Sequence, residues 1–193
     1  MPIPSLPLPL GARMPWFEVL DLDGRPWSTA DADGRPASMI MFLSRHSPYV
    51  KHIERNIGSC AGALLEQGIM VLAISSNDAR AYPSDSRELL KEQASRAGFG
   101  FPYATDETQQ AAKAFQACCT PEFFVYDREL RLVYHGQYDH SRPDNRIAVS
   151  GCDVLQAIQA TCVGEIVSGD QPATLGCSIK WRAGSEPSYV VAF

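Results

Sequence analysis

The pattern of hydrophobic and polar positions predicts a buried strand that runs directly into a long helix. Residues 38–43 form a short apolar run without glycine or proline, which is typical of a strand buried on both faces. Ser47 is a preferred N-cap residue, and Pro48 is tolerated at a first helical position. Apolar residues then recur at helical spacing: Val50, Ile53, Ile57, Cys60, Ala61 and Leu64. The turn Ser44-Arg45-His46-Ser47 therefore opens a helix, whose N-terminus presents free N–H groups.

The rest of the chain alternates between strand and helix patterns. Residues 17–22 and 25–28 flank Asp23-Gly24, a strong tight-turn signal, and predict an N-terminal β-hairpin. Further strands are expected at 69–75, 122–126 and 132–134, and further helices at 86–97, from Asp106 to about 115, and at 151–163. Strand–helix–strand connections imply parallel pairing, so we expect an α/β domain with a mixed sheet flanked by helices.

The length of 193 residues fits one domain with additions at its ends. Residues 1–16 carry prolines at 2, 4, 7 and 9, and they predict an extended N-terminal arm. Residues 17–165 form the predicted domain, and residues 166–193 an irregular C-terminal tail that packs on it.

Composition and charge exclude several functions. The net charge is −5 and no lysine and arginine cluster is present, which argues against nucleic-acid binding. No apolar run approaches the length of a membrane span, and the N-terminus lacks the features of a signal peptide. We therefore expect a cytoplasmic protein whose six cysteines are mostly free thiols. The cysteines and histidines lack zinc-site spacing, so neither a metal nor another cofactor is expected.

Six separated blocks of sequence carry a family resemblance. They are residues 42–52 (Phe-Leu-Ser-Arg-His-Ser-Pro-Tyr-Val-Lys-His), 74–78 with 82–83, 101–107, 117–121, 136–143 and 176–181. In this order they resemble bacterial thioredoxin-like proteins of the alkyl-hydroperoxide-reductase/thiol-specific-antioxidant superfamily, the peroxiredoxin relatives. The resemblance implies a thioredoxin-like fold and thiol-based reduction of disulfides or peroxides. It implies a protein disulfide, a thiol reductant or a peroxide as partner.

The turn departs from the family pattern, which usually reads Cys-x-x-Cys-Pro. Ser44 and Ser47 stand at the two cysteine positions. The resemblance makes position 44 the attacking cysteine and 47 its resolver, or 47 the sulfur that reacts with peroxide, and it makes Arg45 and His46 candidates for substrate binding. A thiol at a helix N-terminus beside basic residues is reactive, whereas a serine can form neither a disulfide nor a sulfenic acid. We therefore expect weak or no activity at this turn.

Three explanations for the two serines are open. They are engineered replacements, they mark a redox-inactive member that binds a partner or ligand through the old groove, or the chemistry has moved to other cysteines. A structural role as helix N-cap accounts for Ser47 under each of them. A serine hydrolase is disfavoured, because no Gly-x-Ser-x-Gly elbow or acid partner is evident.

Cys119 is one candidate for relocated thiol chemistry. The resemblance places a cis-proline at Pro121 beside the turn and lets the backbone of Thr120 pair with substrate. Cys119 then lies close to the turn, as a reactive or resolving thiol or, like Cys118, as a small apolar filler.

Cys177 is the second candidate thiol. It lies in the tail beside Gly176, where it is either folded onto the active face or packed as a filler. The other cysteines, at positions 60, 152 and 162, are expected to be structural.

Overall fold

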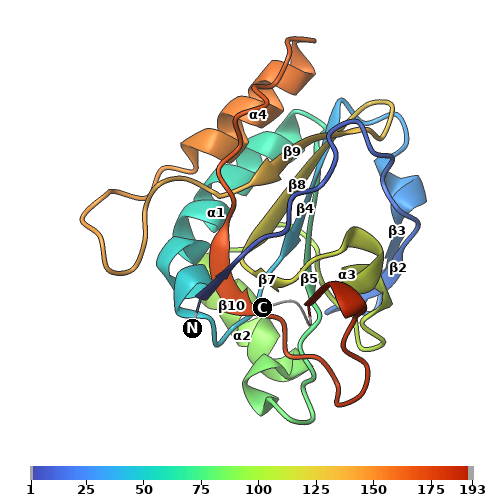
Figure 1. Ribbon diagram of the computed structural model, residues 1–193, viewed down its shortest axis with the longest axis vertical. Helices are drawn as coiled ribbons and strands as arrows, with labels where there is room; N and C mark the ends of the chain where they lie inside the picture. Colours follow the sequence, from blue (N-terminus) through green and yellow to red (C-terminus); the bar gives the residue numbers. More distant parts are fainter. Residues whose placement is uncertain (1, 191–193) are drawn as a thin grey trace.

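The computed structural model describes residues 2–190 and arranges them around a seven-stranded mixed sheet (Figure 1). The strand order is β3-β2-β6-β5-β4-β8-β9. In chain order the strands are β2 (Glu18–Asp21), β3 (Pro26–Ser28), β4 (Ala37–Phe42), β5 (Met70–Ser75), β6 (Tyr103–Thr105), β8 (Glu122–Asp127) and β9 (Leu132–Gly136). Strands β4, β5 and β6 run parallel, whereas β8 pairs with β4 antiparallel. The predicted mixed sheet with two antiparallel hairpins is confirmed.

Helices cover both faces of this sheet. Helices α1 (Pro48–Glu66), α2 (Arg87–Ala97) and α4 (Cys152–Cys162) pack on the face that carries Met39 and Met41 of β4. Helix α3 (Gln110–Phe115) and the segment around Phe17 pack on the opposite face, against Ile40 and Phe42. Because alternate residues of β4 point to opposite faces, every residue of this strand is buried. Among the residues that the structure describes, three short 3-10 helices complete the fold, at Thr29–Ala32, Pro83–Asp85 and Ser188–Val190.

A second, small sheet joins the two ends of the chain. Its strands are β1 (Pro2–Pro4), β10 (Leu175–Ser178) and β7 (Cys119–Thr120), and β10 lies in the middle and pairs antiparallel with both others. The sequence predicted neither β1 nor β10, because residues about 170 positions apart pair without any local signal. Residue 1 of the expected arm and residues 191–193 of the expected tail lie outside the described residues.

The start of α3 differs from the sequence prediction, which placed its cap at Asp106. The helix begins at Gln110, and Gln109 adopts a left-handed conformation at the N-cap position. Asp106 still accepts hydrogen bonds from the N–H groups of Ala111 (3.3 Å) and Ala112 (2.9 Å), but it does so from outside the helix. Within residues 2–190, no helix combines the length and the hydropathy needed to cross a membrane.

Candidate functional site

The turn between β4 and α1 lies at the carboxyl end of the buried strand β4, as predicted. Ser47 is the N-cap of α1, and its Oγ accepts a hydrogen bond from the Val50 N–H at 3.4 Å. The Ser47 N–H donates in turn to the Ser44 Oγ at 3.3 Å. These bonds satisfy a free donor at the helix start and fix the shape of the turn.

Both serine hydroxyl groups contact Thr120, which precedes Pro121. The Ser44 Oγ lies 3.0 Å from the Thr120 Oγ1, and the Ser47 Oγ donates to the Thr120 carbonyl oxygen at 3.0 Å. Both serines are 0% exposed. The Thr120–Pro121 peptide bond is cis. Because each hydroxyl is buried and bonded to Thr120 rather than to a general base, neither is activated as a nucleophile.

The backbone of Thr120 pairs with the chain's own strand β10. Thr120 lies directly opposite Cys177 in the antiparallel register, and the Thr120 Oγ1 donates to the Cys177 carbonyl oxygen at 3.5 Å. A Cβ atom on Gly176 would lie 2.5 Å from the Thr120 carbonyl oxygen, so only glycine allows β10 to approach this closely. The backbone that the family resemblance assigns to substrate is therefore occupied by residues 175–178.

Arg45 and His46 lie at the half-exposed rim of the turn, where a buried carboxylate holds them. The Asp85 carboxylate accepts the Arg45 N–H at 2.6 Å, lies 2.5 Å from the His46 Nδ1 and accepts the Asn77 side-chain amide at 2.8 Å. Burial raises the pKa of Asp85, but the hydrogen bonds from His46, Asn77 and Arg45 outweigh it, so the pKa lies below its ordinary value. The Arg45 guanidinium also lies 3.6 Å from the Glu92 carboxylate.

Asp85 is the site residue that sequence reasoning missed. It lies in the polar segment after β5, and β4 and β5 are adjacent parallel strands. The segments that follow two such strands emerge at the same edge of a sheet, which is the signal that would have pointed to Asp85.

Cys119 faces away from the turn and lies in the protein interior. Both Cys119 and Cys118 are 0% exposed. A hydrogen bond with the Cys118 thiol, burial and the negative charge of Glu122 together raise the pKa of the Cys119 thiol well above its ordinary value. A thiol that stays protonated at neutral pH is a poor nucleophile.

The structure brings Ser44, Ser47, Thr120 and Cys177 together and leaves Cys119 outside this group. Residues directly opposite in an antiparallel pair have side chains on the same face, with Cβ atoms about 5 Å apart. Cys177 therefore shares a face with the Thr120 side chain, which contacts Ser44. Cys177 is partly exposed, and all six cysteines are free thiols.

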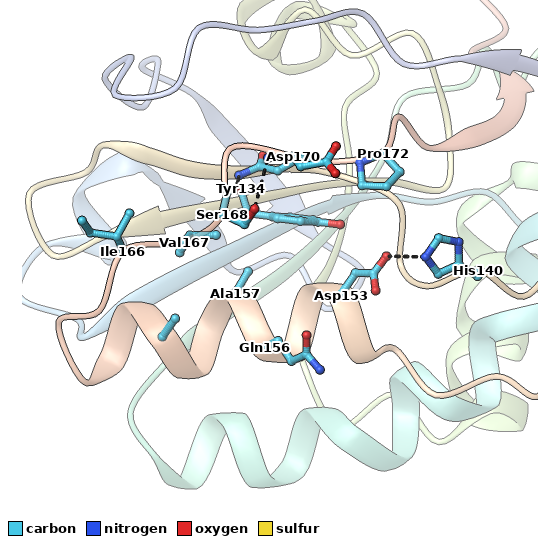
Figure 2. Close-up of a pocket in the computed structure, with 12 residues that line it drawn as sticks. Tyr134, His140, Asp153, Gln156, Ala157, Ile166, Val167, Ser168, Asp170 and Pro172 are labelled. Atoms are coloured by element: carbon cyan, nitrogen blue, oxygen red, sulfur yellow. Dashed lines mark hydrogen bonds and ion pairs between the residues drawn. The ribbon is translucent and has the colours of Figure 1, made fainter.

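A cavity of about 410 Å³ lies elsewhere, between α4 and the segment that leads to β10 (Figure 2). At one end of it the Asp153 carboxylate lies 4.0 Å from the His140 Nε2. At the other end the lining is apolar and includes Ala157, Ile166 and Val167. None of the site residues that the sequence predicts lines this cavity.

Comparison with known proteins finds one matching family model and several similar solved structures. The model of the AhpC/TSA family matches residues 10–135. A hypothetical protein from Sinorhizobium meliloti 1021 has a similar solved structure, with 41% sequence identity and a TM-score of 0.91 over 94% of this chain and 99% of that chain. An uncharacterized conserved protein from Geobacillus kaustophilus has the same identity and TM-score over 94% of this chain and 97% of that chain.

More distant structures share the fold alone. One is a thiol:disulfide interchange protein of the thioredoxin family from Chlorobium tepidum TLS, with 16% identity and a TM-score of 0.62 over 81% of this chain and 99% of that chain. No curated protein sequence matches the chain.

Proposed function

Because the chain belongs to the AhpC/TSA family, we propose that it is a thioredoxin-fold redox protein in which disulfide or peroxide reduction is weak or lost at the 44–47 turn. One observation carries this proposal: the hydroxyl groups of Ser44 and Ser47 are buried and bonded to Thr120. The turn has the arrangement of a thiol site, but here the two serine hydroxyl groups hold the start of α1 against β7.

The chemistry of the turn supports this proposal. Disulfide exchange needs a thiolate that attacks a sulfur atom, and peroxide reduction needs a sulfur that becomes a sulfenic acid. A hydroxyl group offers neither reaction. His46 is the nearest base in the sequence, and its Nδ1 contacts the Asp85 carboxylate. Neither serine bonds to His46.

We assign the thiol chemistry that remains near the turn to Cys177. It is partly exposed and shares a face with the Thr120 side chain, whereas Cys119 is buried with a raised pKa. Its partner would be a small disulfide, a thiol or a peroxide. The six free cysteines support a reducing compartment such as the cytosol.

A redox-inactive binding module is the second candidate, and the Thr120 edge does not favour it. Recognition of an extended peptide by strand addition needs an unpaired edge. Strand β10 pairs with Thr120 in the same antiparallel manner, so a partner would have to displace it.

Two measurements test the proposed function. The first exposes the reduced chain to a stoichiometric hydroperoxide or a small disulfide and maps the oxidised cysteines by peptide mass. We expect Cys177 to react first and Cys119 to stay reduced.

The second measurement restores the sulfur atoms at the turn. The Ser44→Cys/Ser47→Cys variant should gain disulfide-reductase turnover that neither the unsubstituted chain nor Ser44→Ala/Ser47→Ala shows. Turnover by the unsubstituted chain that Ser44→Ala/Ser47→Ala lacks would contradict the proposed loss of activity at this turn, because the serines would then take part in the reaction. A cysteine variant that stays inert would favour the binding module.

A further inference from the structure

We propose that Cys118, Cys119 and Glu122 form a buried binding site for Zn²⁺, which is separate from the proposed function of the turn. One donor atom of each residue, two sulfurs and a carboxylate oxygen, lies within 4.8 Å of the other two. All three residues are 0% exposed. The spacing of cysteines and histidines along the chain predicts no metal site. These donors are instead two adjacent cysteines and a glutamate within one five-residue segment.

Glu122 gathers the two cysteines around its carboxylate. The Glu122 Oε2 accepts the N–H groups of Cys118 (2.8 Å) and Cys119 (3.1 Å). These bonds wrap residues 118 and 119 around the carboxylate, so that both sulfurs converge on it although neighbours in an extended chain point to opposite sides.

His135 contacts the other oxygen of the Glu122 carboxylate. Its Nε2 lies 2.8 Å from the Glu122 Oε1, and its ring stacks on Phe124 with a centroid distance of 4.5 Å. Ligating carboxylates in metal sites are themselves held by hydrogen bonds of this kind, which fix their orientation. His135 is therefore a positioning residue and not a ligand.

The two sulfurs have only weak partners within the protein. The Cys118 Sγ donates to the Pro4 carbonyl oxygen at 3.5 Å, and the Cys119 Sγ donates to the Pro121 carbonyl oxygen at 3.8 Å and to the Glu122 Oε2 at 3.7 Å. Binding of Zn²⁺ would replace these contacts with two metal–thiolate bonds and release two protons to solvent. The carbonyl oxygens of Pro4 and Pro121 border the site and offer a fourth donor for tetrahedral coordination.

The donor set and the burial favour zinc. Thiolate ligands select Zn²⁺ or Cu⁺ over magnesium and calcium. Two thiolates and one carboxylate carry three negative charges, of which a divalent ion offsets two and a monovalent ion one. Because uncompensated charge is costly in the interior, Zn²⁺ fits better than Cu⁺.

The test titrates the full reduced chain with Zn²⁺ against a chromophoric chelator and uses Co²⁺ as a spectroscopic probe. We expect one Zn²⁺ per chain and a thiolate-to-cobalt charge-transfer band. His135→Gln should keep the cysteines and weaken Zn²⁺ binding about 10- to 100-fold. Cys118→Ser and Cys119→Ser should weaken it at least as much. Cys60→Ser, which changes a half-buried thiol on α1, should not weaken it.

Three results would overturn the site. One is the same Zn²⁺ affinity in the unsubstituted chain and in Cys118→Ser/Cys119→Ser. Another is preferential loading of Cu⁺ at these cysteines. The third is a Co²⁺ complex of the unsubstituted chain without a thiolate band. This measurement depends on no variant and therefore stands even if the serine variants fail to fold. None of these results bears on turnover at the 44–47 turn, so the two proposals fail separately.

Discussion

Thr120 and Cys177 are direct cross-strand partners in the antiparallel pairing of β7 with β10. Thr120 also contacts both serines of the turn, at 3.0 Å each. One buried threonine therefore links the helix start, where the family carries its cysteines, to a partly exposed thiol from the C-terminal segment. This segment lies where the family resemblance expects a substrate strand.

The first prediction concerns a cysteine at position 44. Since the Thr120 side chain contacts Ser44 and shares a face with Cys177, we expect Ser44→Cys to form an intramolecular disulfide with Cys177 on mild oxidation. Non-reducing peptide mapping would identify the linked pair. The matched control is Ser44→Cys/Cys177→Ser, which should remain a free thiol. A crosslink to Cys119, or only intermolecular dimers, would contradict the placement of Cys177.

The second prediction concerns the close approach of β10 to Thr120. In Gly176→Ala the new Cβ would lie 2.5 Å from the Thr120 carbonyl oxygen and 2.7 Å from the carbonyl carbon, so β10 must move. We expect a loss of about 1–3 kcal/mol in the free energy of unfolding, which is typical of overpacking. Cys177 should also react faster with a thiol reagent, because the strand that carries it packs less closely on β7.

The control for this variant is another glycine in open space. A Cβ on Gly62, inside α1, would meet no atom within 4 Å. Gly62→Ala should therefore raise the free energy of unfolding by about 0.5–1 kcal/mol and leave Cys177 reactivity unchanged. Equal Cys177 reactivity in both variants would show that the close packing of β10 on β7 does not shield this thiol.

The elements around the turn were predictable because their signals are local. The apolar run at 38–43, the serine–proline pair at 47–48 and the Asp23-Gly24 turn each lie within a few residues of what they specify. Pairings between distant segments carry no such signal. The Arg45 N–H bonds Asp85 across 40 positions, and β10 could be placed against β7 only in three dimensions.

The candidate site was predictable in part for the same reason. The turn and its serines follow from the sequence and the family resemblance, but the surroundings of each cysteine do not. The sequence Cys-Cys-Thr-Pro-Glu does not indicate that the Glu122 carboxylate accepts the N–H groups of Cys118 and Cys119, or that Cys119 faces the interior. The same carboxylate contacts His135, which comes from the neighbouring strand β9.

The third prediction concerns the buried carboxylate that holds the rim of the turn. The folded state lowers the pKa of Asp85 from its ordinary value of 3.8. The unfolded chain therefore binds the proton more readily, and the contribution of Asp85 to stability is present above about pH 4 and is lost as the pH falls through the lowered pKa. We expect Asp85→Asn to be less stable than the unsubstituted chain at pH 7, and the difference in the free energy of unfolding to narrow below pH 4, as measured by urea unfolding.

The control for the pH experiment is an exposed acidic residue. Asp23 lies 3.0 Å from the Lys91 ammonium group, and 89% of its side chain is exposed. Because exposed ion pairs contribute little, Asp23→Asn should change stability by less than about 1 kcal/mol at either pH. A gap for Asp85→Asn that stays constant between pH 7 and pH 3 would contradict the role of its charge.

The last prediction separates the structural role of Ser47 from any chemical one. Ser47→Ala removes both the cap of α1 and the bond to the Thr120 carbonyl oxygen. Loss of a cap costs about 0.5–2 kcal/mol, and a buried carbonyl left without its partner adds to this cost. Ser59→Ala, whose hydroxyl bonds only to the nearby Asn56 carbonyl on the exposed face of α1, should be nearly neutral in urea unfolding. If Ser47→Ala were as stable as Ser59→Ala and lost activity toward a peroxide or disulfide, the hydroxyl would be a reacting group, and the proposal that this turn is purely structural would be wrong.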